Sequence, residues 1–208
     1  MDEWWRRRTA FICLRTQPER VMDLCCGTGD LAIWLARLAK PGTEVIGLDY
    51  SLPMLKLANE KATPSLFKTR LSFIHGDVND LPFPDGHFDS IGISFAFRNL
   101  TYKNPHMERY LKEVVRVIKP GGEFVIVESS QPSNRLIRAL VHAYERWFVY
   151  YAGYWITQNR PAYKYLSESA QRFYTAEELA NLLIAAGFKK VDVKHLFFGV
   201  AAIHIAVK

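Results

Sequence analysis

Short apolar runs with strand character alternate with helix-period segments along most of this chain. We expect helices at 30–39, 51–62 and 104–118, and strands at 20–25, 44–49, 71–77, 88–96 and 123–130. The expected strands are almost continuously apolar, which is typical of strands that are covered on both faces. This alternation predicts an α/β fold with a parallel sheet and right-handed crossovers.

The end of the chain departs from this alternation. A helical stretch is expected at 134–156 and a further helix at 175–187, followed by strands at 189–198 and 200–208. Because only Gly199 separates these strands, no helical crossover fits between them, and we expect an antiparallel hairpin. A doubly wound, mostly parallel seven-stranded sheet with this ending differs from the usual dinucleotide-binding arrangement. It favours the Rossmann-like fold of S-adenosylmethionine (SAM)-dependent methyltransferases.

A glycine turn follows the first expected strand. Gly27, Thr28 and Gly29, with Ala32 after them, formally fit the dinucleotide fingerprint. Asp49 ends the next strand, where a ribose-binding acid belongs. The motif alone therefore leaves both NAD and SAM open as ligands.

The acids around the turn favour SAM over NAD. A dinucleotide places its pyrophosphate at the helix N-terminus, but Asp30 already occupies that end and Asp23 lies near it. Asp30 can cap the helix as well. SAM has no phosphate and carries a sulfonium and an ammonium, so these acids attract it. The glycines let the backbone approach the methionine part, and Asp49 can accept both ribose hydroxyls.

Other strand ends supply residues to the same expected site. Asp77 ends the third strand and is expected to bind the adenine amino group beside apolar Val78. Ser94 lies at the end of the fourth strand, at the sheet edge where open α/β sheets bind ligands. We include Tyr50, next to Asp49, among the cofactor-binding residues.

The composition limits the class of protein. The 208 residues, 49% of them hydrophobic, suffice for a single domain spanning 1–208, with a helical, aromatic lid insertion at about 131–174. The aromatic run at 147–156 is too short to cross a bilayer, and no signal peptide is expected. Three cysteines form no disulfide framework, so we expect a reducing, cytoplasmic location. The net charge of +6 permits contact with nucleic acid or an anionic membrane.

Several stretches together resemble the UbiE family, the C-methyltransferases of ubiquinone and menaquinone biosynthesis. They include "DLCCGTGDL", "SFAFRNLT", "VIKPGGEFVIVESSQP" and "YKYLSESAQRF", and the resemblance covers nearly the whole chain. It implies methyl transfer from SAM to a ring carbon of a polyprenylated quinol, leaving S-adenosylhomocysteine (SAH). Its SAM contacts fall on Thr28, Asp49, Asp77, Val78 and Ser94. The family usually has a longer lead-in, so we expect either a trimmed protein or a more open pocket.

Methyl transfer is an in-line displacement that needs alignment and exclusion of water more than a covalent nucleophile. Something must favour the ionised acceptor, and Arg98 is our candidate because of its fixed positive charge. The alternative is that Arg98 pairs with a nearby acid and braces its loop. Asn99 is a candidate for positioning the acceptor oxygen, and His142 for a base.

Other interpretations have less support from the sequence. The acids at 77, 80, 85 and 89 lie in a turn-rich loop with Pro82, Pro84 and Gly86, so we expect no metal site. Basic residues are spread along the chain apart from Arg6–Arg8, so we expect no nucleic-acid partner. The aromatic helix at 134–156 can pack on the sheet and hold a prenyl tail. Its arginines can face anionic lipid head groups at the inner face of the membrane. A homodimer is compatible with the sequence, as is another small lipid or metabolite as substrate.

Overall fold

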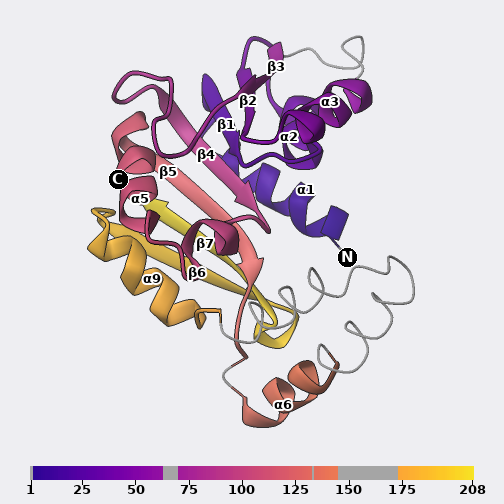
Figure 1. Ribbon diagram of the computed structural model, residues 1–208, viewed down its shortest axis with the longest axis vertical. Helices are drawn as coiled ribbons and strands as arrows, with labels where there is room; N and C mark the ends of the chain where they lie inside the picture. Colours follow the sequence, from indigo (N-terminus) through magenta and orange to yellow (C-terminus); the bar gives the residue numbers. More distant parts are fainter. Residues whose placement is uncertain (1, 63–69, 133, 145–172) are drawn as a thin grey trace.

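The computed structural model describes residues 2–62, 70–132, 134–144 and 173–208. Within these residues the core element is one seven-stranded sheet with the order β3-β2-β1-β4-β5-β7-β6 (Figure 1). Its strands are β1 (Arg20–Leu24), β2 (Glu44–Asp49), β3 (Arg70–His75), β4 (Phe88–Ser94), β5 (Ile118–Ser129), β6 (Lys190–Leu196) and β7 (Ala201–Val207).

The strand directions confirm the predicted fold class. The four pairings among β1 to β5 are parallel, whereas β7 runs antiparallel to both β5 and β6. The order reverses between β1 and β4, where the chain leaves one half of the sheet for the other. Asp23 of β1 is in register with Gly47 of β2 and Gly92 of β4. Open α/β sheets bind ligands beyond the carboxyl ends of their strands at such a reversal.

Helices cover both faces of the sheet, as Figure 1 shows. Successive strand residues point to opposite faces, so Val21 joins the apolar cluster under α1 and α2, and Met22 joins the cluster under α5 and α9. Gly92 allows the close approach on the first face, because an added Cβ would lie 3.0 Å from Cys13 Sγ. The helices are α1 (Asp2–Cys13), α2 (Asp30–Leu38), α3 (Leu52–Lys61), α4 (Phe97–Thr101), α5 (Met107–Val117), α6 (Arg135–Tyr144) and α9 (Ala176–Ala185).

Local structure differs from the sequence prediction at several places, among them the fifth strand, which begins at Ile118 and not at residue 123. Helix α1 was not predicted. The fourth strand ends at Ser94 and not at residue 96, because Phe95 has a left-handed φ of 55° and α4 follows at once. The hairpin between β6 and β7 is antiparallel as predicted, but a 3₁₀ turn, η3 (Phe197–Gly199), replaces the single-glycine link.

The expected aromatic helix is described only in part. Helix α6 covers ten residues near its start, Arg135–Tyr144, and residues 145–172 of the predicted lid lie outside the described residues. Leu136 and Leu140 of α6 are largely exposed. Among the described residues no helix has the length and apolar character needed to span a membrane.

Candidate functional site

A pocket of about 660 Å³ lies at the carboxyl ends of the central strands. The segments that follow β1, β2, β3 and β4 all contribute to its wall, together with α1 and α3. Eight of the nine predicted cofactor-binding residues line it: Asp23, Gly27, Thr28, Asp49, Tyr50, Asp77, Val78 and Ser94. The topology thus brings together side chains that are up to 71 positions apart in the sequence, from Asp23 to Ser94.

Asp49 fixes the geometry of the glycine turn. The backbone N–H of Gly27 donates to Asp49 Oδ2 at 2.7 Å, and the backbone N–H of Ser51 donates to Oδ1 at 2.8 Å. These two bonds hold the carboxylate in one orientation between β1 and β2. A carboxylate oxygen has two acceptor positions, so each oxygen keeps one for a ligand hydroxyl.

The two glycines of the turn have different tasks. Gly27 lines the pocket, and a Cβ added there would meet no atom within 4 Å. Gly29 is the ninth predicted residue and is not part of the described pocket wall. It begins α2 with a φ of 79°, and a Cβ there would lie 2.8 Å from the Phe73 ring. Gly29 therefore serves packing and chain direction, whereas Gly27 leaves the backbone open to a ligand.

Asp23 is a fully buried acid at the end of β1. Its Oδ2 accepts the backbone N–H of Ala32 at 2.9 Å. Burial raises the pKa of this carboxyl to about 8, while the Ala32 bond and Arg6 oppose the shift. A buried anion in this position is costly, and a cationic ligand would lower that cost.

Asp30 belongs to a small polar cluster at the start of α2. Lys61 Nζ donates to Thr28 Oγ1 at 2.8 Å and to Asp30 Oδ1 at 3.1 Å. Thr28 Oγ1 in turn donates to Asp30 Oδ2 at 3.2 Å. Asp30 makes no side-chain cap, since the N-cap of α2 is Gly29. The cluster connects the end of α3 to the glycine turn.

The opposite end of the pocket is formed by the segments after β2 and β3. Asp77 is exposed, Val78 is buried beside it, and Tyr50 is 72% exposed at the rim. The Tyr50 ring lies 5.8 Å from the His75 ring, centroid to centroid. An acid, an apolar side chain and an aromatic ring therefore line the pocket beyond the ends of these two strands.

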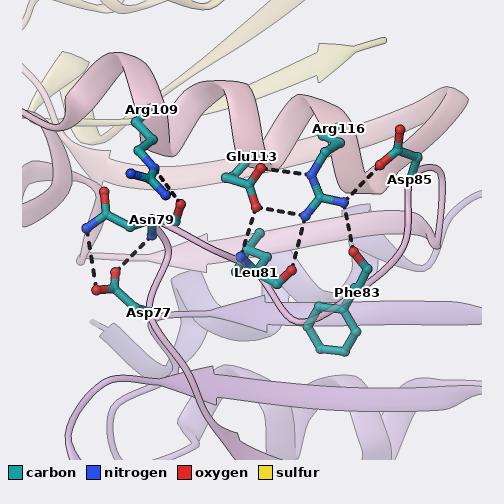
Figure 2. A network of polar contacts seen from close by, with 8 residues as sticks. All are labelled: Asp77, Asn79, Leu81, Phe83, Asp85, Arg109, Glu113 and Arg116. Carbon is teal, nitrogen blue, oxygen red and sulfur yellow. Dashed lines mark hydrogen bonds and ion pairs between the residues drawn. The ribbon is translucent and has the colours of Figure 1, made fainter.

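Figure 2 shows the polar contacts that hold the acid-rich loop that begins at Asp77. Arg116 of α5 donates to the carbonyls of Leu81 and Phe83 at 3.0 and 2.8 Å, and to Asp85 at 2.9 Å. Glu113 receives two bonds from Arg116 and accepts the Leu81 backbone N–H at 2.9 Å. This pairing keeps the pKa of Glu113 below its ordinary value.

Three of the four acids of this loop, Asp77, Asp85 and Asp89, are thus bound to protein groups. Asp77 accepts from the Asn79 backbone N–H at 2.8 Å, and Asp89 bonds Lys119 and two backbone N–H groups. Across the part of the chain that the structure describes, no three His, Cys, Asp or Glu residues gather as metal ligands. The absence of a metal requirement stays a prediction.

The segment after β4 forms the third side of the pocket. Ser94 Oγ is shielded from solvent and has no hydrogen-bond partner among the described residues. Phe95 has a positive φ, as does Cys25 after β1, so two adjacent strands end at strained non-glycine residues in the pocket wall. Such strain gathers at ligand sites. Asn99 is exposed and also lines the pocket.

Arg98 lies on α4 behind this wall and is not one of the described pocket residues. Its Nη1 donates to Ser129 Oγ at 3.2 Å, and its backbone N–H donates to Glu128 Oε2 at 3.2 Å. Burial raises the pKa of the Glu128 carboxyl, and the Arg98 charge opposes the shift. Arg98 Nε has no hydrogen-bond partner among the described residues. The Arg98 side chain therefore contacts β5.

The remaining candidates divide into two groups. His142 falls within α6, but its side chain lies outside the described residues. Cys25 and Cys26 line the pocket, and burial raises the pKa of both thiols, so neither is a thiolate at neutral pH.

The sequence analysis did not assign Arg6 and Glu128 to the site. Arg6 lines the pocket from α1, and Glu128 bonds the Arg98 backbone. The helical spacing of the apolar residues Trp5, Ile12 and Cys13 was the signal that could have predicted α1.

The chain matches known proteins over its full length. The model of the ubiE/COQ5 methyltransferase family matches residues 1–208. The demethylmenaquinone methyltransferase of Thermus thermophilus is 41% identical over 98% of this chain and 89% of that protein. The ubiquinone/menaquinone biosynthesis C-methyltransferase UbiE of Pseudomonas putida is 34% identical over 100% of this chain and 80% of that protein.

Solved structures share the fold at low sequence identity. A SAM-dependent methyltransferase from Aquifex aeolicus has a TM-score of 0.64 and 18% identity, covering 100% of this chain and 98% of its own. The [4+2]-cyclase SpnF has a TM-score of 0.68 and 19% identity, covering 97% of this chain and 80% of its own. These likenesses show the fold alone, because one fold carries different reactions. The full-length family match shows more: the chain is a methyltransferase that belongs to the ubiE/COQ5 methyltransferase family.

Proposed function

We propose that this enzyme transfers the methyl group of SAM to a ring carbon of a polyprenylated quinol. The acceptor is of the demethylmenaquinol or the 2-methoxy-6-polyprenyl-benzoquinol type. The observation that carries the proposal is the similarity to relatives named demethylmenaquinone methyltransferase and ubiquinone/menaquinone biosynthesis C-methyltransferase, over 80% or more of their length.

SAM would extend along the carboxyl edge of the sheet, in the order of the strands. The adenine would lie between Tyr50 and Val78 with its amino group on Asp77, and the ribose hydroxyls would donate to Asp49. The methionine part would lie at Gly27 and the glycine turn. Support comes from the free acceptor positions of Asp49 and from the open space at Gly27.

The methyl group would then point towards the β4–β5 side of the pocket. Transfer needs the two carbons about 3–3.5 Å apart and in line, with water excluded. An ionised hydroxyl next to the acceptor carbon supplies the electron density. Arg98 would stabilise this oxyanion, and Asn99 would position it; the free Nε of Arg98 and the exposed amide of Asn99 support these roles. His142 is the alternative group for deprotonation.

The acceptor's prenyl tail suggests that the enzyme works at a lipid surface. We propose peripheral contact with the inner face of the cell membrane, in a cytoplasmic protein. Helix α6 supports this proposal, because Leu136 and Leu140 are 69% and 64% exposed and Arg135 is exposed near them. We propose neither a metal nor a nucleic acid as partner, and a homodimer is compatible with the proposal.

The test is direct detection of the methylated product. The purified chain is incubated with SAM and a demethylated short-chain quinol, and the product is identified by mass spectrometry. One added methyl group on a ring carbon supports the proposal. Methylation of an oxygen, or activity only towards unrelated lipids or metabolites in a substrate panel, would contradict it. Tight, steeply salt-dependent binding to RNA would instead favour a nucleic-acid substrate.

A further inference from the structure

Arg6 stands out among the residues that line the pocket. The described pocket wall contains four acids, at positions 23, 30, 49 and 77, but its only positively charged side chain is that of Arg6. SAM carries three charged groups, of which the sulfonium and the ammonium are positive and the methionine carboxylate is negative. The acids suit the first two groups and repel the third. Arg6 is therefore the one charged side chain of this described wall that attracts a carboxylate.

The fold holds Arg6 beside the glycine turn. Helix α1 packs on α2, with Ala10 and Cys13 in the same apolar cluster as Leu31. This packing carries Arg6 to the pocket, where its Cζ lies 5.7 Å from the centroid of the Phe95 ring. Arg6 also borders a neighbouring hollow with Asp30 and Lys61, at the start of α2. Its position is therefore next to the start of α2, where the proposed methionine end would lie.

The N–H donors of the Arg6 guanidinium are not used by the described residues. Among the described residues it stacks on the Phe95 ring, and no hydrogen bond or ion pair to them engages its five N–H donors. The planar fork of a guanidinium matches the two oxygens of a carboxylate. A cation–π contact with Phe95 uses the charge of the guanidinium and leaves its N–H donors available to a ligand.

We propose that Arg6 binds the methionine carboxylate of SAM. The inference rests on the proposed placement of SAM in this pocket. It gives the enzyme a means of distinguishing SAM from adenosyl sulfonium compounds that lack the carboxylate. It also gives α1 a role in cofactor recognition, in addition to covering the sheet.

The test compares two ligands and two arginines. Calorimetry measures the affinity for SAM and for decarboxylated SAM, which keeps the adenosine, sulfonium and ammonium but lacks the carboxylate. The variant is Arg6→Gln, which keeps most of the side-chain length. Arg8→Gln is the matched control, because Arg8 lies on the same helix, is exposed, and stacks on Trp4 away from the pocket.

We expect Arg6→Gln to weaken SAM binding by roughly tenfold to a hundredfold, the range for hydrogen bonds between charged groups. Binding of decarboxylated SAM should change less than about twofold, and Arg8→Gln should leave both affinities unchanged. Arg6→Lys should recover part of the loss, because an ammonium keeps the charge but not the fork. An equal loss for both ligands, or no loss for either, would overturn the inference.

The proposed cofactor site can fail separately. If the unaltered protein binds neither ligand, the placement of SAM in this pocket is wrong, and the role of Arg6 is wrong with it. If it binds SAM and Asp49→Ala weakens both ligands, the placement stands. In that case, an Arg6→Gln variant with unchanged selectivity overturns only the carboxylate contact.

Discussion

The two halves of the site differ in how far their polar groups are already bonded. On the cofactor side, after β1 to β3, Asp49 accepts a backbone N–H on each oxygen and Asp77 accepts one from Asn79. In the segments after β4 and β5, Arg98 Nε on the proposed acceptor side and Ser94 Oγ, a predicted SAM contact, are shielded from solvent without a hydrogen-bond partner among the described residues. An unpaired buried polar group costs about 1–3 kcal/mol.

This contrast separates two ways of building a binding site. The cofactor side is preorganised by short turns, whose backbone N–H groups orient the acids before any ligand arrives. The acceptor side keeps donors that are satisfied only when another group reaches them, whether a ligand or a segment outside the described residues. We therefore expect substitutions on the cofactor side to change affinity, and those on the acceptor side to change turnover.

The largest effect is expected on the acceptor side, at Arg98. If Arg98 stabilises the ionised acceptor, its help is realised mainly in the transition state. Arg98→Ala should lower turnover by roughly a hundredfold, about 2.7 kcal/mol, with SAM affinity almost unchanged. Arg98→Lys should restore only part, and raising the pH should partly rescue the alanine variant by ionising the quinol in solution. A rate–pH profile on a short-chain quinol measures all three.

The controls for Arg98 must distinguish a role in catalysis from a structural role in holding its segment in place. Lys103→Ala removes a charge from an exposed residue just after α4 and should leave turnover unaltered. Urea unfolding of Arg98→Ala reports the loss of the positive charge beside buried Glu128. Wild-type turnover in Arg98→Ala, or a loss fully explained by unfolded protein, would make Arg98 a brace and leave His142 as the next residue to test.

A smaller effect is expected on the cofactor side, at Asp49. Asp49→Ala should weaken SAM binding by more than tenfold, because a carboxylate that accepts two hydroxyls contributes about 1.5–3 kcal/mol. Asp192→Ala on β6, at the far edge of the sheet, is the matched control and should have no effect. Calorimetry that finds unchanged affinity in Asp49→Ala would remove SAM from this pocket, and tighter binding of NADH would favour a dinucleotide.

The site residues at the strand ends were easier to predict from the sequence than those on the helices that pack over the sheet. Period and topology suffice to predict that Asp49, Asp77 and Ser94 meet, since parallel strands bring their carboxyl ends to one edge. The pocket wall contains all three. What they bind stays a prediction, although the family match agrees with it.

Residues that reach the site by tertiary packing were harder to predict. Arg6 arrives because α1 packs on α2, and no local pattern specifies that contact. Glu128 lies within an apolar strand whose sequence does not reveal which end meets α4. Phe95 was placed inside a strand because its residue type suits one, whereas its backbone adopts the left-handed conformation that glycine usually takes.

A further prediction concerns pH on the cofactor side. Burial raises the pKa of Asp23 to about 8, from about 3.9 in the unfolded chain. Between these values the folded protein holds a proton that the unfolded chain lacks, so this carboxyl lowers stability as the pH rises from about 4 to about 8. The positively charged sulfonium and ammonium of SAM would favour the ionised form of Asp23. SAM binding should therefore release a proton from this carboxyl group. Affinity should therefore rise between about pH 6 and pH 8, by less than tenfold per unit.

Asp23→Asn tests the pH prediction, since the amide cannot titrate. Arg6 opposes the rise in the pKa of Asp23, whereas Asp49 and Asp30 add to it. The substitution leaves all three of these charged residues in place. Calorimetry in two buffers of different ionisation enthalpy counts the protons released on binding. The variant should show a flatter affinity profile and release fewer protons than the unaltered protein. An equal slope in both proteins would assign the pH dependence to another group.

The smallest expected effect is that of removing metal ions, for which we predict none. Most acids of the loop after β3 already bind protein groups, as Asp85 binds Arg116 and Asp89 binds Lys119. A hard cation needs several oxygens converging on one point, and binding one here would separate Asp85 from Arg116 and Asp89 from Lys119. Dialysis against EDTA should therefore leave turnover unchanged. A loss of turnover that magnesium restores would contradict this prediction. It would make the acid-rich loop the candidate metal site.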